Sequence, residues 1–270
     1  AEAGGVPLDA LHYDVDAICH CYEQIAAPAQ RLKVAPPAPR LAGFAYCHVS
    51  TLGAEILFAE GSEPNVVPLL KRPEDVDTLR EPADYLARGL APARLAALER
   101  LRMRHPGAVR SIGHLYEGPV TTAALLMGPD FFRLPYEDPA RAHRLLLFCV
   151  RSAVNYARAV RNVLGEKIAP GPVSIPDDFA GIFDPDTFAA FVTPYWNRMY
   201  EALCAAKRYL HSELLRPVHL PFLAALNIAE FDPSADQYVT PELLRAQCPV
   251  PFTGRIQSWH IGDNSPEELQ

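Results

Sequence analysis

The chain has 270 residues, of which 49% are hydrophobic and 21% are charged, and its formal net charge at pH 7 is -7. This composition is typical of a soluble globular protein, and the length suits one barrel-sized domain over residues 1–270. The acidic balance gives no reason to expect nucleic acid, which binds basic surfaces, and no apolar run approaches the ~20 residues of a membrane-spanning helix.

The first residues and the cysteines bear on the cellular location. Residues 1–5 lack the charged and then apolar layout of a signal peptide, so a cytoplasmic location follows by default. The six cysteines are scattered, which fits reduced thiols better than a disulfide framework. The only cluster, Cys19-His20-Cys21, lies in an apolar helical pattern and has no second cysteine pair, which favours helix packing over a zinc finger.

The first part of the chain predicts helices and strands in an irregular order. Apolar residues at helical spacing, bounded by prolines, predict helices over residues 14–33 and 92–105. Apolar runs predict strands over residues 41–49 and 108–116. A glycine-punctuated segment at 51–60 suggests a short hairpin.

From residue 108 onward the predicted elements alternate regularly. Helices are expected over residues 138–164, 184–206, 217–226 and 241–247, with a last helix that starts at Ser265. Short strands are expected over residues 173–176, 208–211, 228–231 and 254–260. This alternation predicts a parallel sheet, either open and doubly wound or closed as a barrel. No glycine-rich dinucleotide or P-loop motif follows any strand.

Polar residues follow many of the predicted strands. They are His48, Glu117, Asp177, Asp178, His211, Glu213, Asp232 and His260. In a parallel barrel all these strand ends lie on one face, where active sites form. Asp232 and one of Asp177 and Asp178 could instead cap helices. His48 and His260 could instead be partly buried and donate hydrogen bonds from their rings. Glu117 precedes Gly-Pro rather than occupying a capping position, which favours a role in a site.

The segment His211-Ser212-Glu213 is the sharpest candidate. In an extended chain residues i and i+2 face the same way, so the imidazole and the carboxylate could share a ligand. Both groups bind zinc. Without a metal the pair could act as a general acid and base, or it could simply be a polar contact that closes a barrel layer. His219 is expected to pack inside the following helix.

Several segments together resemble a known family. Gly118 to Ala123 resembles the Gly-Pro-Phe-Thr segment of the uroporphyrinogen decarboxylase superfamily, and Ile175 to Pro185 resembles its Asp-Asp-x-x-Gly region, with Pro194-Tyr195 after it. Residues 52–55, 63–66 and 73–76 are similar to its early section. The resemblance covers the chain from about Tyr22 to Leu269.

The resemblance implies a (β/α)8 TIM barrel and one of two chemistries. One branch decarboxylates uroporphyrinogen without a cofactor, but its N-terminal Arg-Gln-Ala-Gly-Arg segment has no match here. The other branch moves methyl groups between a corrinoid on a partner protein and an acceptor, with zinc held by His-x-Cys and a later Cys. Here His211 is kept, Glu213 stands where the first thiolate would be, and Cys248 is not at the position of the second.

The resemblance also places residues 41–49 as the second barrel strand and residues 254–260 as the seventh. The first and eighth strands have no candidates in the sequence. An open barrel would leave unpaired edges. We therefore expect the native chain to extend beyond both ends of this sequence.

The predicted function is that of a metal-assisted methyltransferase that moves a methyl group between a small molecule and a corrinoid on a partner protein. His211 and Glu213 are the predicted zinc ligands. Glu117, Asp178 and His260 are candidates for the remaining ligands or for proton transfer. The alternatives are a metal-free decarboxylase or lyase acting on a carboxylated small molecule or tetrapyrrole, and a non-catalytic barrel that binds a small molecule. No membrane or nucleic-acid partner is expected.

Overall fold

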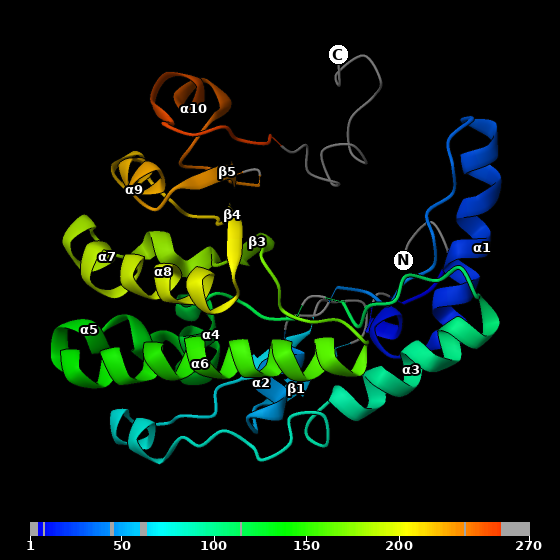
Figure 1. Ribbon diagram of the computed structural model, residues 1–270, viewed down its shortest axis with the longest axis horizontal. Helices are drawn as coiled ribbons and strands as arrows, with labels where there is room; N and C mark the ends of the chain where they lie inside the picture. The colour runs from blue at the N-terminus through cyan, green and yellow to red at the C-terminus, as the bar shows by residue number, and fades with distance from the viewer. Residues whose placement is uncertain are drawn as a thin grey trace. The chain divides into compact units, whose positions relative to one another are not determined.

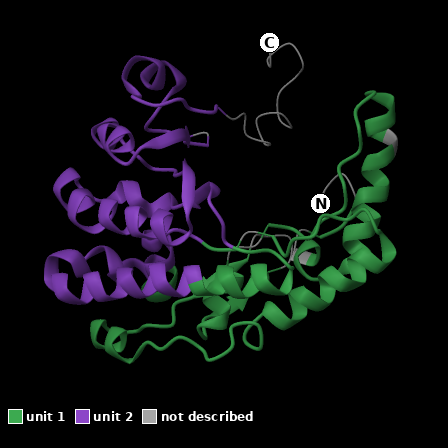
Figure 2. Ribbon diagram, viewed as in Figure 1, with its two compact units in different colours: residues 1–116, 125–127, 155–167 green, residues 117–124, 128–154, 168–270 purple. Residues whose placement is uncertain are grey.

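The computed structural model describes residues 5–7, 9–43, 46–59, 64–113, 115–234 and 236–254 (Figure 1). Nearly all of the strand predicted at 254–260 and the helix predicted from Ser265 lie outside this part. The chain divides into two compact units (Figure 2): unit 1 holds residues 1–116, 125–127 and 155–167, and unit 2 holds residues 117–124, 128–154 and 168–270. The single domain over residues 1–270 stays a prediction.

Unit 1 contains mostly helices and one small hairpin. Its elements are η2 (Asp9–His12), α1 (Val15–Arg31), α2 (Cys47–Thr51), β1 (Glu55–Leu57), β2 (Asn65–Val67), η3 (Pro73–Thr78) and α3 (Ala91–Arg104). Helix α1 begins as predicted, because the Asp14 carboxylate accepts hydrogen bonds from the amides of the first turn. Strands β1 and β2 pair antiparallel. The predicted hairpin is therefore present, with its second strand beyond the predicted range.

Two predicted strands of unit 1 are wrong. In the range 41–49, residues 41–43 lie outside any strand, and the end of the range belongs to helix α2. All five residues of α2 are buried, so the run shows neither strand nor helix periodicity. Among the described residues of 108–116 none belongs to a strand; Val109 donates a backbone hydrogen bond to Pro39 instead of joining a ladder. The apolar run reflects burial, because Ala108, Ile112 and Tyr116 are all buried.

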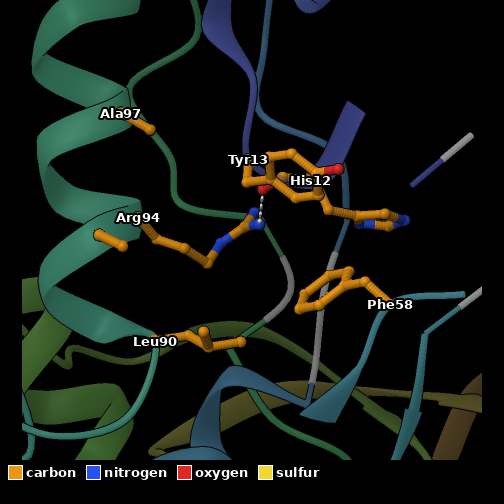
Figure 3. Close-up of a pocket in the computed structure, with 7 residues that line it drawn as sticks. His12, Tyr13, Phe58, Leu90, Arg94 and Ala97 are labelled. Carbon is orange, nitrogen blue, oxygen red and sulfur yellow. Dashed lines mark hydrogen bonds between the residues drawn. The ribbon is translucent and has the colours of Figure 1, made fainter. Parts of the chain in front are cut away.

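A buried arginine ties the segments of unit 1 together. Arg94 of α3 is 4% exposed and donates to the carbonyl oxygens of His12 at 2.9 Å, Ala42 at 2.6 Å and Ile112 at 2.6 Å. Beside it lies a pocket of about 220 Å³ (Figure 3). The pocket is lined by His12, Tyr13, Phe58, Leu90, Ala93, Arg94 and Ala97.

Unit 2 holds the strand and helix repeats that the sequence predicts. Before the sheet come α4 (Pro119–Met127), η4 (Gly128–Phe132), α5 (Leu134–Glu137) and α6 (Pro139–Val163); the last residues of α4 and α6 belong to unit 1. Then follow β3 (Gly171–Pro176), η5 (Asp178–Ile182), α7 (Pro185–Phe191), α8 (Thr193–Ala202), β4 (Ala205–His211), η6 (Pro217–His219), α9 (Leu220–Ala225), β5 (Ile228–Asp232) and α10 (Pro241–Gln247). The three strands predicted in this region are confirmed, with small shifts of their bounds.

The three strands form one parallel sheet in the order β3-β4-β5. Pro176 lies opposite His211, and His211 lies opposite Asp232, so all three strands end side by side. Phe252 forms a parallel bridge with Phe231 on the outer side of β5, just before the predicted last strand. The α/β class and the alternation are thus as predicted, and the described strands of unit 2 form an open sheet.

The helix predicted over 184–206 is in fact two helices and the start of a strand. Asp184 caps α7 as expected, accepting from the amides of Asp186 and Thr187. The chain then breaks at Val192, because Pro194 in the first turn of α8 has no N–H to continue α7. Strand β4 begins at Ala205, directly after Cys204, which has a positive φ of 58°. None of the described helices is long and apolar enough to cross a membrane.

Candidate active site

An imidazole lies between two carboxylates at the carboxyl end of the sheet in unit 2. His211 ends β4, and its Nε2 is 3.4 Å from Oδ1 of Asp178, which follows β3. Its Nδ1 is 3.1 Å from Oδ2 of Asp232, which ends β5. The three side chains are 23%, 33% and 18% exposed, in the order His211, Asp178 and Asp232. They are therefore open to a ligand from solvent.

A cation on or beside the His211 ring would stabilise this arrangement. A neutral imidazole has one donor and one acceptor nitrogen, so with a carboxylate at each nitrogen one lone pair would face a negative oxygen. A proton or a metal ion removes that repulsion. Burial raises the pKa of Asp178, and the negative charge of Glu213 adds to this, while a charged His211 lowers it. The His211–Asp178 pair is thus suited to holding a proton between its two members.

Glu117 supplies a buried acid from the turn before α4. Its Oε2 is buried and has no hydrogen-bond partner among the described residues. Burial, and then the negative charges of Asp178 and Asp177, raise the pKa of Glu117 well above its ordinary value. Glu117 therefore keeps its proton to a higher pH than an exposed glutamate does.

Asp177 is a cap, but not of the helix that follows it. It is fully buried and accepts hydrogen bonds from the amides of Thr121 at 2.6 Å and Val120 at 3.2 Å, in the first turn of α4. The indole N–H of Trp196 donates to the same carboxylate at 2.6 Å. Burial raises the pKa of Asp177 to about 6, although these donors favour its ionised form. The predicted cap of the following helix is therefore wrong for Asp177, because its side chain makes no cap bond to η5 and instead accepts from the first turn of α4.

The residues predicted to hold zinc are only partly brought together. The amide of Glu213 donates to Asp178 Oδ1 at 3.4 Å, and its side chain is half-buried. Among the residues that the structure describes, no group of three or more His, Cys, Asp or Glu side chains could hold a metal ion. Imidazole and carboxylate are nevertheless the donor types that zinc accepts, so the chemistry of His211 and its neighbours fits zinc. Their role as ligands stays a prediction.

The other predicted histidines have different surroundings. His260 lies outside the described residues. His48 is buried in α2 of unit 1, with its ring stacked on Tyr156 at 5.5 Å. His219 packs inside unit 2 as expected: its Nδ1 accepts from the Arg216 amide at 3.0 Å, and its Nε2 donates to the Phe183 carbonyl at 2.9 Å.

Two contacts of the site were missed or left ambiguous by the sequence. The sequence leaves Asp232 open as a site residue or a cap; its Oδ1 accepts from the Ser234 amide, and its Oδ2 faces His211. The strand register could have found this pair, because both residues end adjacent parallel strands. Trp196, which holds Asp177, gives no such signal, because nothing in the sequence of α8 indicates where its indole points.

Comparison with known proteins identifies the family. The family model described as uroporphyrinogen decarboxylase (URO-D) matches residues 45–264. The chain belongs to this family. The resemblance drawn from the glycine-proline and paired-aspartate segments is thereby confirmed.

Three proteins that the chain is similar to are methyltransferases by name. Two methylcobamide:CoM methyltransferases MtaA of Methanosarcina barkeri are 30% and 29% identical to the chain over 143 residues, the second from strain Fusaro / DSM 804. The match covers 52% of this chain and 41% of each relative, so the chain spans well under half of their length. A solved methyltransferase from Methanosarcina mazei has a TM-score of 0.64 at 20% identity, over 87% of this chain and 67% of that one. At this identity the structural likeness concerns the fold.

Proposed function

We propose that this member of the URO-D family is a methyltransferase, which moves a methyl group between a small molecule and a corrinoid carried by a partner protein. The named relatives support this choice, because the curated name of MtaA refers to a methylcobamide as methyl carrier and to CoM. The same proposal includes the closed (β/α)8 barrel, of which β3, β4 and β5 would be neighbouring strands.

The charge of the site is the observation that carries the proposal. Glu117, Asp177 and Asp178 are acidic, and His211 is the only basic side chain that pairs with any of them in the described part of the chain. A substrate with several carboxylates would meet negative charge without a matching Arg or Lys. An uncharged methyl donor or acceptor meets no such penalty, and one with a single negative charge meets a smaller penalty.

Each residue has a proposed role in methyl transfer. His211 and Glu213 are the proposed zinc ligands, and zinc bound there would act as a Lewis acid that lowers the pKa of an acceptor. Asp232 orients the His211 ring through Nδ1, as outer carboxylates do for ligating histidines. Asp178 takes the proton that the acceptor loses as it gains the methyl group, because burial raises the pKa of this carboxyl. His260 is kept as a further candidate for proton transfer.

The buried carboxylic acid of Glu117 is the observation that supports the alternative function, decarboxylation. Decarboxylation ends when a carbanion is protonated, and a carboxylic acid that keeps its proton is suited to that step. Glu117 is such an acid. In methyl transfer the same proton would go to the leaving group of a methyl donor. The two functions therefore share Glu117 and differ in the substrate charge and in the need for a metal.

Metal analysis of the purified chain separates the two functions. We expect about one zinc per chain after purification without chelator, lost in His211→Ala and in Glu213→Ala. His20→Ala is the matched control, because His20 is an exposed histidine of α1 in unit 1. Zinc that stays bound in His211→Ala would contradict the proposed ligands. A metal-free wild-type chain that releases carbon dioxide from a carboxylated substrate would favour the decarboxylase.

A further inference from the structure

Asp177 lies where four elements of unit 2 meet, and the proposed chemistry does not use it directly. We propose that Asp177 is the positioning residue of the site: held in place by the end of β4, its carboxylate fixes the turn that carries Glu117. This inference depends on the proposed function in one respect only, namely that the reaction uses the Glu117 proton. Its geometry stands on the contacts of Asp177 itself.

The main chain of Asp177 is anchored to the strand that ends in His211. The Asp177 amide donates to the His211 carbonyl at 2.9 Å, which continues the parallel pairing of β3 and β4 by one residue. The hydroxyl of Ser212 donates to the Asp177 carbonyl at 2.8 Å. Both main-chain polar groups of Asp177 are therefore fixed by the residues at the imidazole.

The side chain of Asp177 holds the Glu117 turn from the other side. One carboxylate oxygen accepts from Thr121, and the other accepts from Val120 and from the Trp196 indole. In addition the Gly118 amide donates to the Pro176 carbonyl at 2.5 Å. The turn that follows Glu117 is therefore held by bonds that begin one, three and four residues after it, all of which end on the segment at 176–177.

Close packing makes this connection rigid. A Cβ atom added at Gly118 would overlap the Cβ and the carboxylate of Asp177, so the turn can approach this closely only with glycine. The approach also puts the Asp177 charge near the Glu117 carboxyl. One side chain thus holds the turn of the buried acid in place and, after burial and Asp178, adds to the causes that raise the pKa of Glu117.

The test follows the protonation of Glu117 and needs no substrate. The chain is labelled with ¹³C at its glutamate carboxyl groups, and the Glu117 signal is assigned by its loss in Glu117→Gln. In Asp177→Asn we expect the Glu117 titration midpoint to fall by about one pH unit, because a nearby negative charge is removed. The other titratable groups around the two carboxyls, Asp178, His211, Glu213 and Cys149 of α6, are left in place.

Trp196→Phe is the matched control. It removes one donor and some packing from the same network but keeps the Asp177 charge and its two bonds to α4. We expect the Glu117 midpoint of this variant to stay at the wild-type value. The proposal is overturned if Asp177→Asn leaves the midpoint unchanged, or if Trp196→Phe lowers it equally, because Asp177 would then be only a part of the packing.

A second variant keeps the proposal testable if Asp177→Asn does not fold. Gly118→Ala retains every titratable group and forces the turn away from Asp177. We expect the Glu117 midpoint to fall here too, and a wild-type midpoint in folded Gly118→Ala would overturn the proposal. The Glu117 midpoint does not depend on whether the chain transfers methyl groups. The proposed function and the positioning role of Asp177 can therefore fail independently of each other.

Discussion

The buried imidazole of His48 makes unit 1 sensitive to acid. His48 is fully buried in α2, and burial lowers its pKa to about 3, with only a partial opposing effect of Glu81. In the unfolded chain its pKa returns to 6.5. Because the folded pKa is depressed, only the unfolded state binds this proton at pH values between about 3 and 6.5. Stability is therefore complete above about pH 6.5 and is lost as the pH falls below it.

The size of the effect follows from the two pKa values. Each pH unit below 6.5 costs about 1.4 kcal/mol, and between about pH 7 and pH 5 the total is about 2 kcal/mol. His48→Phe keeps a ring stacked on Tyr156 but cannot take up a proton. In urea unfolding over this range, followed by circular dichroism, the wild-type chain should lose about 2 kcal/mol more than the variant.

His20→Phe is the control for this comparison. The side chain of His20 is exposed, so its replacement should leave the pH dependence of the wild-type chain unchanged. Equal losses of stability in wild type and His48→Phe would refute the reasoning, because they would show that the imidazole is already charged or solvated in the folded state.

Three further predictions concern unit 2. The folded pKa of Asp177 is about 6, against an ordinary 3.8, so the folded state holds this proton to a higher pH than the unfolded state does. From about pH 4 to pH 7 the wild-type free energy of unfolding should therefore fall by about 3 kcal/mol relative to that of Asp177→Asn. If urea unfolding gave the same difference between the two proteins at both pH values, this prediction would be contradicted. His219→Phe leaves the Arg216 amide and the Phe183 carbonyl without partners and should cost about 2–5 kcal/mol, so an unchanged urea midpoint would be inconsistent with these bonds. Glu117→Gln resembles the protonated acid, so its melting temperature should stay close to wild type while turnover falls about 10²-fold or more; a wild-type rate would exclude proton transfer by Glu117.

The fold was predictable where polar residues and prolines in the sequence mark the ends of strands and the starts of helices. Strands β3, β4 and β5 are short, a polar residue ends or directly follows each of them, and a proline-started helix comes later in the chain before the next strand or at the end of the described part. Residues 41–49 and 108–116 have similar composition, but burial alone explains their apolar character. Whether an apolar segment becomes a strand depends on a distant partner, which composition does not reveal.

Which residues gather at the site was largely predictable from the sequence, but most of their pairwise contacts were not. The rule that parallel strands end on one face brings Asp178 and His211 together correctly. The second contact of His211, with Asp232, depends on the strand register. The contact of Asp177 with Trp196 depends on how α8 is turned. Sharing of a metal by His211 and Glu213 stays a prediction.

Demethylation of a corrinoid tests the proposed function most directly. The chain is mixed with zinc, methylcobalamin and the CoM that the MtaA relatives are named for, and the absorption of methylcobalamin is followed. We predict demethylation above background by wild type and by His20→Ala, and none by His211→Ala. Methylcobalamin that stays intact with the wild-type chain, or equal rates with and without the His211 imidazole, would contradict methyl transfer at this site.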